Sequence, residues 1–332
     1  MLAEEPIKKA LKPLKSWLLG DARTLIIQSH QLLGRMASWQ VRSQKVLSSL
    51  RDAEFSVSSE WGEDGIIDWL VEHAKIPPAS QTFVEFGVET YREVNTRFLL
   101  QNRNWRGLII DGNSAMVSKV KEDGLAWRHD LTAIPAFITR ENIDELISGA
   151  GFTGEIGLLS IDIDGNDYWI WEAIQAVRPI ICVCEYNAVF GDVYPISTPY
   201  DCTFNRTKAH HSNLYFGASI AALRILAVNK GYRFVGTNAA ANDAFFVRED
   251  YAIQFVDRHL LQIEALPSLR RESRNKCGQL SYRSGIERLK LIAGLPVVNV
   301  VTGESIRLGA LESIYSKEWL EIMVGRPSLG YS

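Results

Sequence analysis

The chain has 332 residues, of which 46% are hydrophobic and 23% charged, so it is long and apolar enough to bury a full α/β core. A formal net charge of −3 argues against a nucleic-acid backbone as the main partner. No apolar run reaches the ~18 residues that a membrane span needs, and the amino terminus lacks a signal-peptide core. With four cysteines and no CxxC pair, we expect a soluble, cytoplasmic protein without a membrane partner.

The first fifty residues predict a helix that does not belong to the α/β domain that follows it. Apolar residues recur seven positions apart, at Leu25, Leu32, Trp39 and Val46. Because Ser29 and Ser43 interrupt the second apolar row, a long coiled coil is not expected. The helix either lies on its own domain or forms a dimer contact, and both alternatives stay open. We assign residues 1–57 to an N-terminal helical extension.

Strands and helices then alternate along the chain. The predicted strands are TFVEFGV, GLIIDGN, LAWRHD, the stretch GLLSIDIDGND at 157–167, and PIICVCEYN. The predicted helices between them are EVNTRFLLQN, MVSKVKEDG, residues 134–148 and YWIWEAIQAV. This alternation predicts βαβ units in an α/β, doubly wound, mostly parallel sheet.

The chain continues with a long loop at 188–215, a helix at 219–231, and a predicted antiparallel hairpin of YRFVGTN and DAFFVRED. A loop of this length is typical of lids and binding segments. We assign 58–250 to the α/β domain and 251–332 to a C-terminal appendage. Its basic cluster from Arg270 to Lys276 is interpreted as a solvated face or a dimer contact.

The stretch at 157–167 carries the first functional signal. Its apolar run ends in Asp162, Asp164 and Asp167 around Gly165. In open α/β sheets ligands bind at the carboxyl ends of the strands, so three acids within six residues there favour a site. The alternative is a polar turn in which Asp164 or Asn166 caps the helix that follows.

The other strand ends favour a nucleoside. A carboxylate after the second strand, here Asp111, is how doubly wound folds hold a ribose, and Gly87 after the first strand permits close approach to the backbone. No further glycines follow Gly87 at the GxGxxG spacing, and no P-loop lysine is present. A nucleoside without phosphates therefore fits better than a dinucleotide or ATP.

The ordered series of these acids is specific enough to indicate a family. Glu85-x-Gly87, Asp111, Asp130, Asp162-x-Asp164 and Glu185-x-Asn187, closed by the hairpin, resemble a class I S-adenosylmethionine-dependent methyltransferase. The phrases FVEFGVETYREVNTRFLL, FITRENIDEL, LLSIDIDGNDYWIWEAI, CEYNA and YFGAS resemble FkbM-like methyltransferases and sugar O-methyltransferase relatives. The resemblance covers roughly 58–250. It implies a Rossmann-like, seven-stranded sheet with one reversed strand, and methyl transfer to a hydroxyl of a sugar or other small polar acceptor.

The resemblance also implies residue roles. The cofactor-binding set is Glu85, Gly87, Asn95, Asp111, Asp130 and Asp162. Glu85 and Gly87 are expected to border the methionine part, Asp111 to bind the ribose hydroxyls, and Asp130 to bind the adenine amino group. The usual glycine-rich continuation is replaced by residues 88–91, which include Glu89 where the cofactor carboxylate would lie.

A metal site and three catalytic candidates complete these expectations. Asp162, Asp164, Glu185 and Asn187 form an oxygen-rich set suited to Mg²⁺, similar to that of catechol O-methyltransferase and of metal-dependent macrolide-sugar methyltransferases. The alternative has Asp162 binding the cofactor and Glu185 pairing with an arginine. The catalytic candidates are His210, His211 and Asp164.

Two rival functions stay open. Asp162-Ile163-Asp164 is a DxD motif, which is typical of nucleotide-sugar glycosyltransferases, although the acids of the earlier strands would then have no role. The second rival is a methyltransferase-like scaffold without activity. This interpretation depends on Glu89, whose negative charge falls where the cofactor carboxylate would lie. Homo-oligomers through the N-terminal helix or the C-terminal appendage are the expected assemblies.

Overall fold

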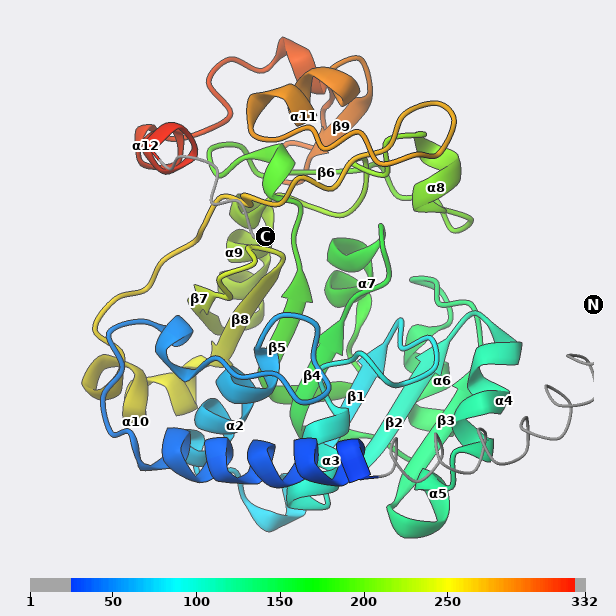
Figure 1. Ribbon diagram of the computed structural model, residues 1–332. Coiled ribbons are helices and arrows are strands. Elements are labelled where there is room, and N and C mark those ends of the chain that lie inside the picture. The colour runs from blue at the N-terminus through cyan, green and yellow to red at the C-terminus, as the bar shows by residue number, and fades with distance from the viewer. Residues whose placement is uncertain (1–24, 326–332) are drawn as a thin grey trace, which may run out of the picture.

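A computed structural model describes residues 25–325, and its centre is a seven-stranded sheet with the order β3-β2-β1-β4-β5-β8-β7 (Figure 1). The strands are β1 (Thr82–Phe86), β2 (Arg106–Asp111), β3 (Leu131–Pro135), β4 (Gly154–Ile161), β5 (Val177–Glu185), β7 (Tyr232–Thr237) and β8 (Asp243–Arg248). The first five are parallel, and β8 runs antiparallel to both of its neighbours. This confirms the predicted doubly wound, mostly parallel sheet of the Rossmann-like methyltransferase fold.

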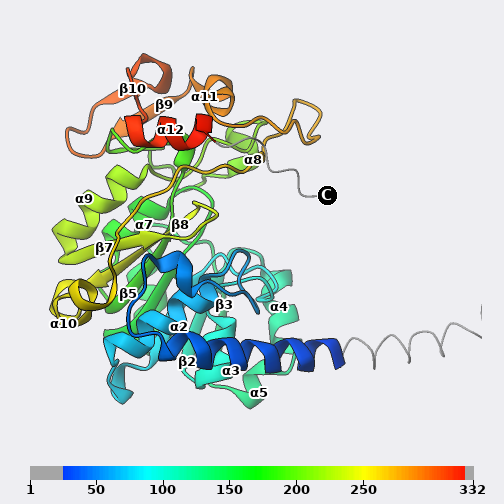
Figure 2. The ribbon, with the colours of Figure 1, turned by 60° about the vertical axis from the view of Figure 1, so that its left-hand side comes forward.

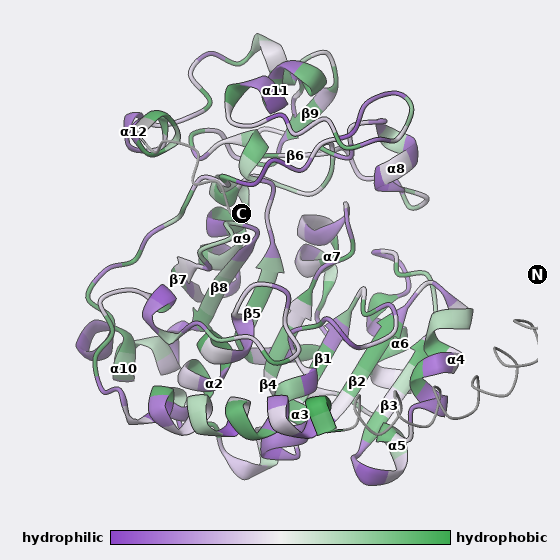
Figure 3. Ribbon diagram, viewed as in Figure 1, coloured by the Kyte–Doolittle hydropathy of each residue, from purple (hydrophilic) through white to green (hydrophobic). Residues whose placement is uncertain are grey.

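Helices cover both faces of the sheet. One face packs on α6 (Ile143–Gly149), α7 (Asp167–Ala173) and α9 (Ile220–Lys230). The other packs on α2 (Glu63–Ala74), α3 (Arg97–Arg103), α4 (Ser114–Glu122) and α10 (Glu249–His259). Strand side chains alternate between the two cores, and in Figure 3 strands β2, β3 and β8 are largely green. Cys182 and Cys184 are buried in the first core.

The third strand differs from its prediction. Residues of LAWRHD form the short helix α5 (Leu125–Arg128), which follows Gly124 at φ +72 and ends where His129 N–H donates to the Leu125 carbonyl. Strand β3 begins only at Leu131, so Asp130 lies at the amino end of the strand. Because β3 occupies the first residues of the helix predicted over 134–148, α6 begins at Ile143.

The amino-terminal helix covers residues 25–43 of the described chain and lies along α2 and α3 (Figure 1). It packs through Gly34, where an added Cβ would be 2.3 Å from Val57, and through Ser38, whose hydroxyl donates to Asp68 at 2.6 Å. The heptad row faces away, with Trp39 79% exposed. The helix therefore lies on its own domain through a different face from the heptad. A dimer contact through the heptad row stays a prediction, and residues 1–24 of the extension lie outside the described part.

A small cap lies over the carboxyl ends of the strands (Figures 1 and 2). It contains the sheet β10-β9-β6, made of β6 (Ile196–Ser197), β9 (Pro296–Asn299) and β10 (Ser305–Arg307). The helices α8 (Arg206–Ala209), α11 (Ile286–Ile292) and α12 (Lys317–Gly325) complete it. The long loop after β5 and the C-terminal residues thus fold together, around an apolar cluster that includes Phe190, Ile196 and Val297.

The residues after 248 contribute to two parts of the structure, the helical layer around α2 and the cap. Helix α10 packs on α2, with the Phe255 ring 6.0 Å from that of Trp69, whereas the residues after it cross to the cap. The domain boundaries at 57/58 and 250/251 stay predictions. Among residues 25–325, no helix combines the length and the apolar character that crossing a bilayer requires.

Candidate functional site

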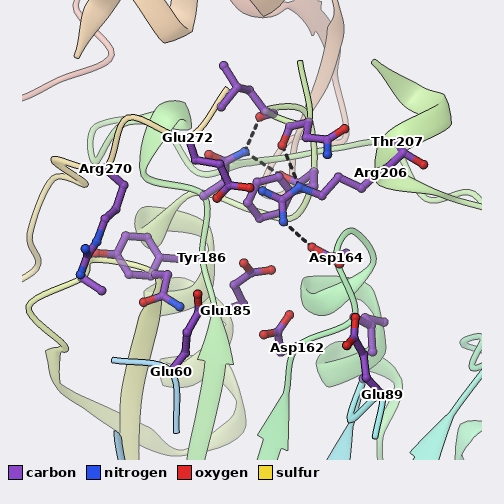
Figure 4. A pocket seen from close by; sticks show the side chains of 18 of the residues that line it. Glu60, Glu89, Asp162, Asp164, Glu185, Tyr186, Arg206, Thr207, Arg270 and Glu272 are labelled. Carbon is purple, nitrogen blue, oxygen red and sulfur yellow. Dashed lines mark hydrogen bonds and ion pairs between the residues drawn. The ribbon is translucent and has the colours of Figure 1, made fainter. Parts of the chain in front are cut away.

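A cavity of about 1150 Å³ lies between the carboxyl edge of the sheet and the cap. Its floor includes Gly87 and Asp162, which directly follow β1 and β4, and Asp111 and Glu185, which end β2 and β5. Its roof comes from α8 and from residues 268–288, here called the strap (Figure 4). The cavity is at least as large as the about 300–1,000 Å³ of typical ligand pockets, so it has room for a cofactor and an acceptor together.

Glu85 is buried beneath the cavity and does not line it. Its carboxylate accepts hydrogen bonds from the backbone N–H of Asn95 at 2.8 Å, from that of Thr96 at 3.2 Å and from the Thr96 hydroxyl. Burial raises the pKa of Glu85 to about 7, although these bonds favour the carboxylate. The Asn95 amide donates to Ser160 at 3.2 Å. Glu85 and Asn95, which were both predicted to bind the cofactor, therefore anchor the loop after β1 and do not line the cavity.

Gly87 does line the cavity, and its position requires glycine. Its φ is +73, and an added Cβ would lie 1.6 Å from the carbonyl oxygen of Asp162. The ends of β1 and β4 can therefore approach each other only with glycine at this position. The loop continues with two more left-handed residues, Glu89 and the buried Tyr91.

Asp111 ends β2 in the position predicted for a ribose contact. Its two carboxylate oxygens each accept one backbone N–H at 2.7 Å, from Glu89 and from Asn113. Each oxygen keeps further lone-pair capacity, and the residue lines the cavity. Phe137 and Ile138, which follow β3, line the same end of the floor. Together they offer a diol acceptor beside an apolar slot, which is the combination that an adenosine fits.

Asp130 does not reach this slot, and its predicted contact with adenine is corrected here. It lies at the amino end of β3, does not line the cavity, and its side chain is 71% exposed beside Arg106. The carboxyl end of the same strand presents Phe137 instead. The apolar run LTAIPAFI directly after Asp130 was the signal in the sequence for where the strand lies.

Asp162, Asp164 and Glu185 come together, as predicted, with one oxygen of each within 4.8 Å of the others (Figure 4). Burial raises the pKa of Asp162 and of Glu185 well above the usual carboxyl range, and the charge of Asp164 raises both further. Glu185 Oε2 is buried without a hydrogen-bond partner. Burying an unsatisfied polar atom is costly, so this oxygen is a candidate ligand atom.

The third acid of the motif has a structural role. The Asp167 carboxylate accepts the backbone N–H of Ile163 at 2.8 Å and of Gly165 at 2.9 Å, and so holds the turn after β4. Burial raises the pKa of Asp167 to about 6. Neither Asp164 nor Asn166 caps α7 through its side chain, since Asp164 pairs with Arg206 and the Asn166 amide donates to the Asp201 carbonyl.

Asn187 lines the cavity, but the structure gives it no part in the predicted metal set. Its amide nitrogen donates to the carbonyls of Leu214 and Phe216, both at 2.9 Å, and its oxygen accepts Val189 N–H at 2.9 Å. The amide is therefore occupied in joining the end of β5 to the residues that precede α9. The metal candidates reduce to three carboxylates.

The predicted histidines lie near α8 but not at the site. His210 Nδ1 is 2.7 Å from the Ser212 hydroxyl, its ring lies 4.1 Å from that of His211, and neither residue lines the cavity. Burial lowers the pKa of His210. The structure therefore brings Asp164, but neither histidine, to the cavity.

Arg206 is the residue that the sequence reasoning missed. From α8 it pairs with Asp164, donates from Nε to the Asn213 carbonyl at 2.7 Å, and places its guanidinium carbon 3.8 Å from the centre of the Phe216 ring. One guanidinium thus faces three carboxylates (Figure 4). Its position in the long loop, four residues before His210, gave no signal of this role.

The basic cluster of the strap is divided between cavity and solvent. Arg270 and Arg271 line the cavity, and the guanidinium of Arg270 lies 3.4 Å from the ring centre of Trp61. Arg274 and Lys276 do not line it. Arg270 and Arg271 therefore border the cavity while their side chains stay exposed, and a solvated face or a dimer contact stays the prediction for the cluster.

Comparison with known proteins gives only weak similarities. No protein-family model and no curated protein matches the chain. TrmK of M. capricolum in complex with S-adenosylhomocysteine is 14% identical at a TM-score of 0.30, over 54% of this chain and 65% of that chain, just under two thirds. The N-terminal domain of EvdMO1 with S-adenosylhomocysteine bound is 11% identical at 0.38, over 56% and 79%. An S-adenosylmethionine-dependent methyltransferase from Clostridium acetobutylicum is 8% identical at 0.35, over 56% and 90%. Similarities this weak carry no functional argument, so the function has to follow from the residues of the chain itself.

Proposed function

We propose that this protein transfers a methyl group from S-adenosylmethionine to a hydroxyl of a sugar or another small polar acceptor, as FkbM-like enzymes do. The observation that carries the proposal is one cavity in which Gly87 and Asp111 meet the Asp162–Glu185 pair. This cavity lies at the carboxyl edge of a sheet with the methyltransferase strand order. Fold alone is weak evidence for function, so the proposal depends on these side chains.

The cofactor half of the cavity fits S-adenosylmethionine. Asp111 is placed to accept the ribose hydroxyls, Phe137 and Ile138 to contact the adenine, and Gly87 to let the methionine end pass close to the backbone. When bound, the cofactor supplies an electrophilic methyl group on a sulfonium. Glu89 also lines the cavity, its side chain is exposed, and its backbone N–H donates to Asp111 at 2.7 Å.

The acceptor half supplies a proton acceptor. An acceptor hydroxyl that takes up the methyl group would have to lose its proton. Asp162 and Glu185 are the carboxylates of the floor that can take this proton. Alignment and exclusion of water supply most of the remaining acceleration, and the cap provides both.

We further propose that Asp162, Asp164 and Glu185 hold a hard divalent cation such as Mg²⁺. The three oxygens within 4.8 Å, together with the unpartnered Oε2 of Glu185, are the supporting observations. A bound cation would lower the pKa of an acceptor hydroxyl and orient it. Arg206 neutralises part of the same charge and competes for Asp164.

Calorimetric titration with S-adenosylhomocysteine tests the cofactor proposal. We expect binding by the wild type and at least a tenfold loss in Asp111→Ala, because hydrogen bonds to a charged group are worth about 1.5–3 kcal/mol. Asp130→Ala is the control, since Asp130 lies at the opposite edge and should leave the affinity unchanged. No binding by folded wild-type protein at millimolar ligand would contradict the proposal and favour the inactive scaffold.

A nucleotide-sugar glycosyltransferase is the second candidate, favoured by the DxD acids, which do lie together at the floor. A glycosyltransferase should bind UDP-glucose only with manganese and should not bind S-adenosylhomocysteine, whereas the methyltransferase must bind S-adenosylhomocysteine. The same calorimetric experiment with both ligands separates the two functions.

A further inference from the structure

The roof of the cavity carries several arginines and one carboxylate, Glu272, whereas its floor is acidic. Arg270, Arg271 and Arg288 of the strap all line the cavity. Among residues 25–325 none of the three forms an ion pair within 4.0 Å of a carboxylate, whereas Arg206 on α8 pairs with Asp164. Three guanidinium groups on one wall therefore have no anionic partner within the described chain.

Arg288 is the most informative of them, because it is 5% exposed. From α11 it donates to the carbonyl and, at 3.4 Å, to the hydroxyl of Ser268, both of which are uncharged. Its Nε is buried without a partner, and burial lowers the pKa of the guanidinium. The negative charge of Glu272 opposes this lowering of the Arg288 pKa, but Glu272 forms no ion pair with Arg288. A buried cation without a counter-ion is expensive, so the arrangement calls for an anion.

Arginine is the side chain best suited to phosphate. Its planar guanidinium presents several donors in a fixed geometry that matches phosphate oxygens, and it stays charged. Arg270 and Arg271 are exposed, so they can turn toward a ligand, while Arg288 is fixed by Ser268. A phosphate group, with several acceptor oxygens and up to two charges, can engage more than one of these arginines together.

We propose that the acceptor carries a phosphate ester, bound by Arg270, Arg271 and Arg288 at the roof while its hydroxyl is directed to Asp162 and Glu185 at the floor. This inference rests on the proposed methyl transfer, whose acceptor it narrows to sugar phosphates or nucleoside-diphosphate sugars. The opposite charges of the two walls fix the orientation of such a molecule. A neutral sugar would leave the roof arginines unpaired.

Calorimetric titration in the presence of saturating S-adenosylhomocysteine tests the inference with four probes: inorganic pyrophosphate, glucose 1-phosphate, UDP-glucose and glucose. We expect the three phosphorylated probes to bind and glucose not to bind measurably. Tighter binding of UDP-glucose than of glucose 1-phosphate would identify the diphosphate form as the acceptor class. Arg271→Ala should weaken the phosphorylated probes at least tenfold, and so should Arg288→Gln.

Arg274→Ala is the matched control, because Arg274 lies on the same strap but does not line the cavity. It should change the affinities less than twofold. The Arg288→Gln result counts only if the variant matches the wild type in melting temperature and in S-adenosylhomocysteine affinity. If it does not, Arg271→Ala decides the test, because the side chain of Arg271 is exposed and its removal should not disturb folding.

Two outcomes would overturn the inference: phosphorylated probes that bind no better than glucose, or an Arg274→Ala variant as impaired as Arg271→Ala. Either result with intact S-adenosylhomocysteine binding leaves the methyltransferase proposal standing. If the wild type binds phosphorylated probes through Arg271 but never binds S-adenosylhomocysteine, the anion site stands and methyl transfer fails.

Discussion

The two halves of the carboxyl edge use the same residue type in different ways. At the ends of β1 and β2, the carboxylates of Glu85 and Asp111 accept backbone N–H groups on both oxygens. At the ends of β4 and β5, within the described residues 25–325, Asp162 and Glu185 accept no backbone N–H group and one Glu185 oxygen has no partner. One half is satisfied by its own chain and the other is not.

This difference separates positioning from chemistry. A carboxylate held by backbone donors fixes its loop in place, as Glu85 does, or presents a fixed acceptor to a ligand, as Asp111 does. Buried carboxylates without donors repel one another and are stabilised by a proton or a cation. The satisfied half is therefore suited to bind a cofactor, and the unsatisfied half to act on an acceptor.

The largest expected effect comes from forcing the two halves apart. In Gly87→Ala the new Cβ would lie 1.6 Å from the Asp162 carbonyl, so the ends of β1 and β4 must separate. Overpacking and the left-handed backbone together should cost on the order of 3 kcal/mol of unfolding free energy. S-adenosylhomocysteine binding should be lost as well. Denaturant unfolding and calorimetry measure the two effects.

Gly154→Ala provides the control for that change. Gly154 has a φ of +72, nearly that of Gly87, but an added Cβ would meet nothing within 4 Å. It should cost only the backbone penalty of ~1–2 kcal/mol and leave binding intact. Equal losses in the two variants would show that the contact between β1 and β4 does not matter.

Adding a cation should sharpen the contrast by acting on the unsatisfied half alone. We expect Mg²⁺ or Ca²⁺ to raise the melting temperature and a chelator to reverse this, with a gain of about 2.7 kcal/mol at a hundred times the dissociation constant. Glu185→Gln should abolish most of the response, because it removes one of three charged ligands. Thermal denaturation with and without metal measures this.

Glu93→Gln is the matched variant, since Glu93 lines the cavity but is not one of the three clustered acids. It should keep the full metal response. A full response in Glu185→Gln, or no response to chelator in the wild type, would mean that no cation binds at these carboxylates.

A further expected effect is a change in how stability depends on pH. Burial raises the pKa of Glu85 from 4.5 to about 7, so the folded state holds a proton that the unfolded chain releases. The associated stability is fully present below pH 4.5 and is lost as the pH rises to about 7. Glu85→Gln should make the slope of unfolding free energy against pH less steep, by up to about 1.4 kcal/mol per pH unit, which is the slope that one proton contributes.

Chemical denaturation between pH 4 and 8 measures that slope. Some fall should remain in Glu85→Gln, because burial also raises the pKa of Asp64 and of Asp167 to about 6. The exposed Glu122, changed to Gln, controls for the loss of a charge. An unchanged slope in Glu85→Gln would show that Glu85 is ionised in the folded protein.

The sequence predicted those parts of the fold that depend on local pattern. Apolar runs bounded by glycine and acid identified β1, β2, β4 and β5, and the spacing identified the hairpin of β7 and β8. The third strand was displaced because the short apolar start of LAWRHD predicts a strand, whereas a helical turn follows Gly124 there. That shift alone moved Asp130 to the wrong edge of the sheet.

The site was predictable only where it follows strand ends. Asp111, Asp162, Asp164 and Glu185 were found because parallel strands bring their carboxyl ends together. The structural bonds of the Asn187 amide were not predictable, since they depend on residues almost thirty positions away. Arg206 and Arg288 reach the cavity only because the long loop and the C-terminal residues pair in one small sheet, a long-range contact that no local pattern encodes.

The division between the two halves is tested most directly by a crossed measurement of S-adenosylhomocysteine affinity and Mg²⁺ stabilisation in Asp111→Ala and Glu185→Gln. Asp111→Ala should lower the affinity for S-adenosylhomocysteine at least tenfold and keep the metal response. Glu185→Gln should lose the metal response and bind the cofactor product within about twofold of the wild type. If either variant loses both properties while remaining folded, or if the two losses are exchanged, the halves are not separate and the account is wrong.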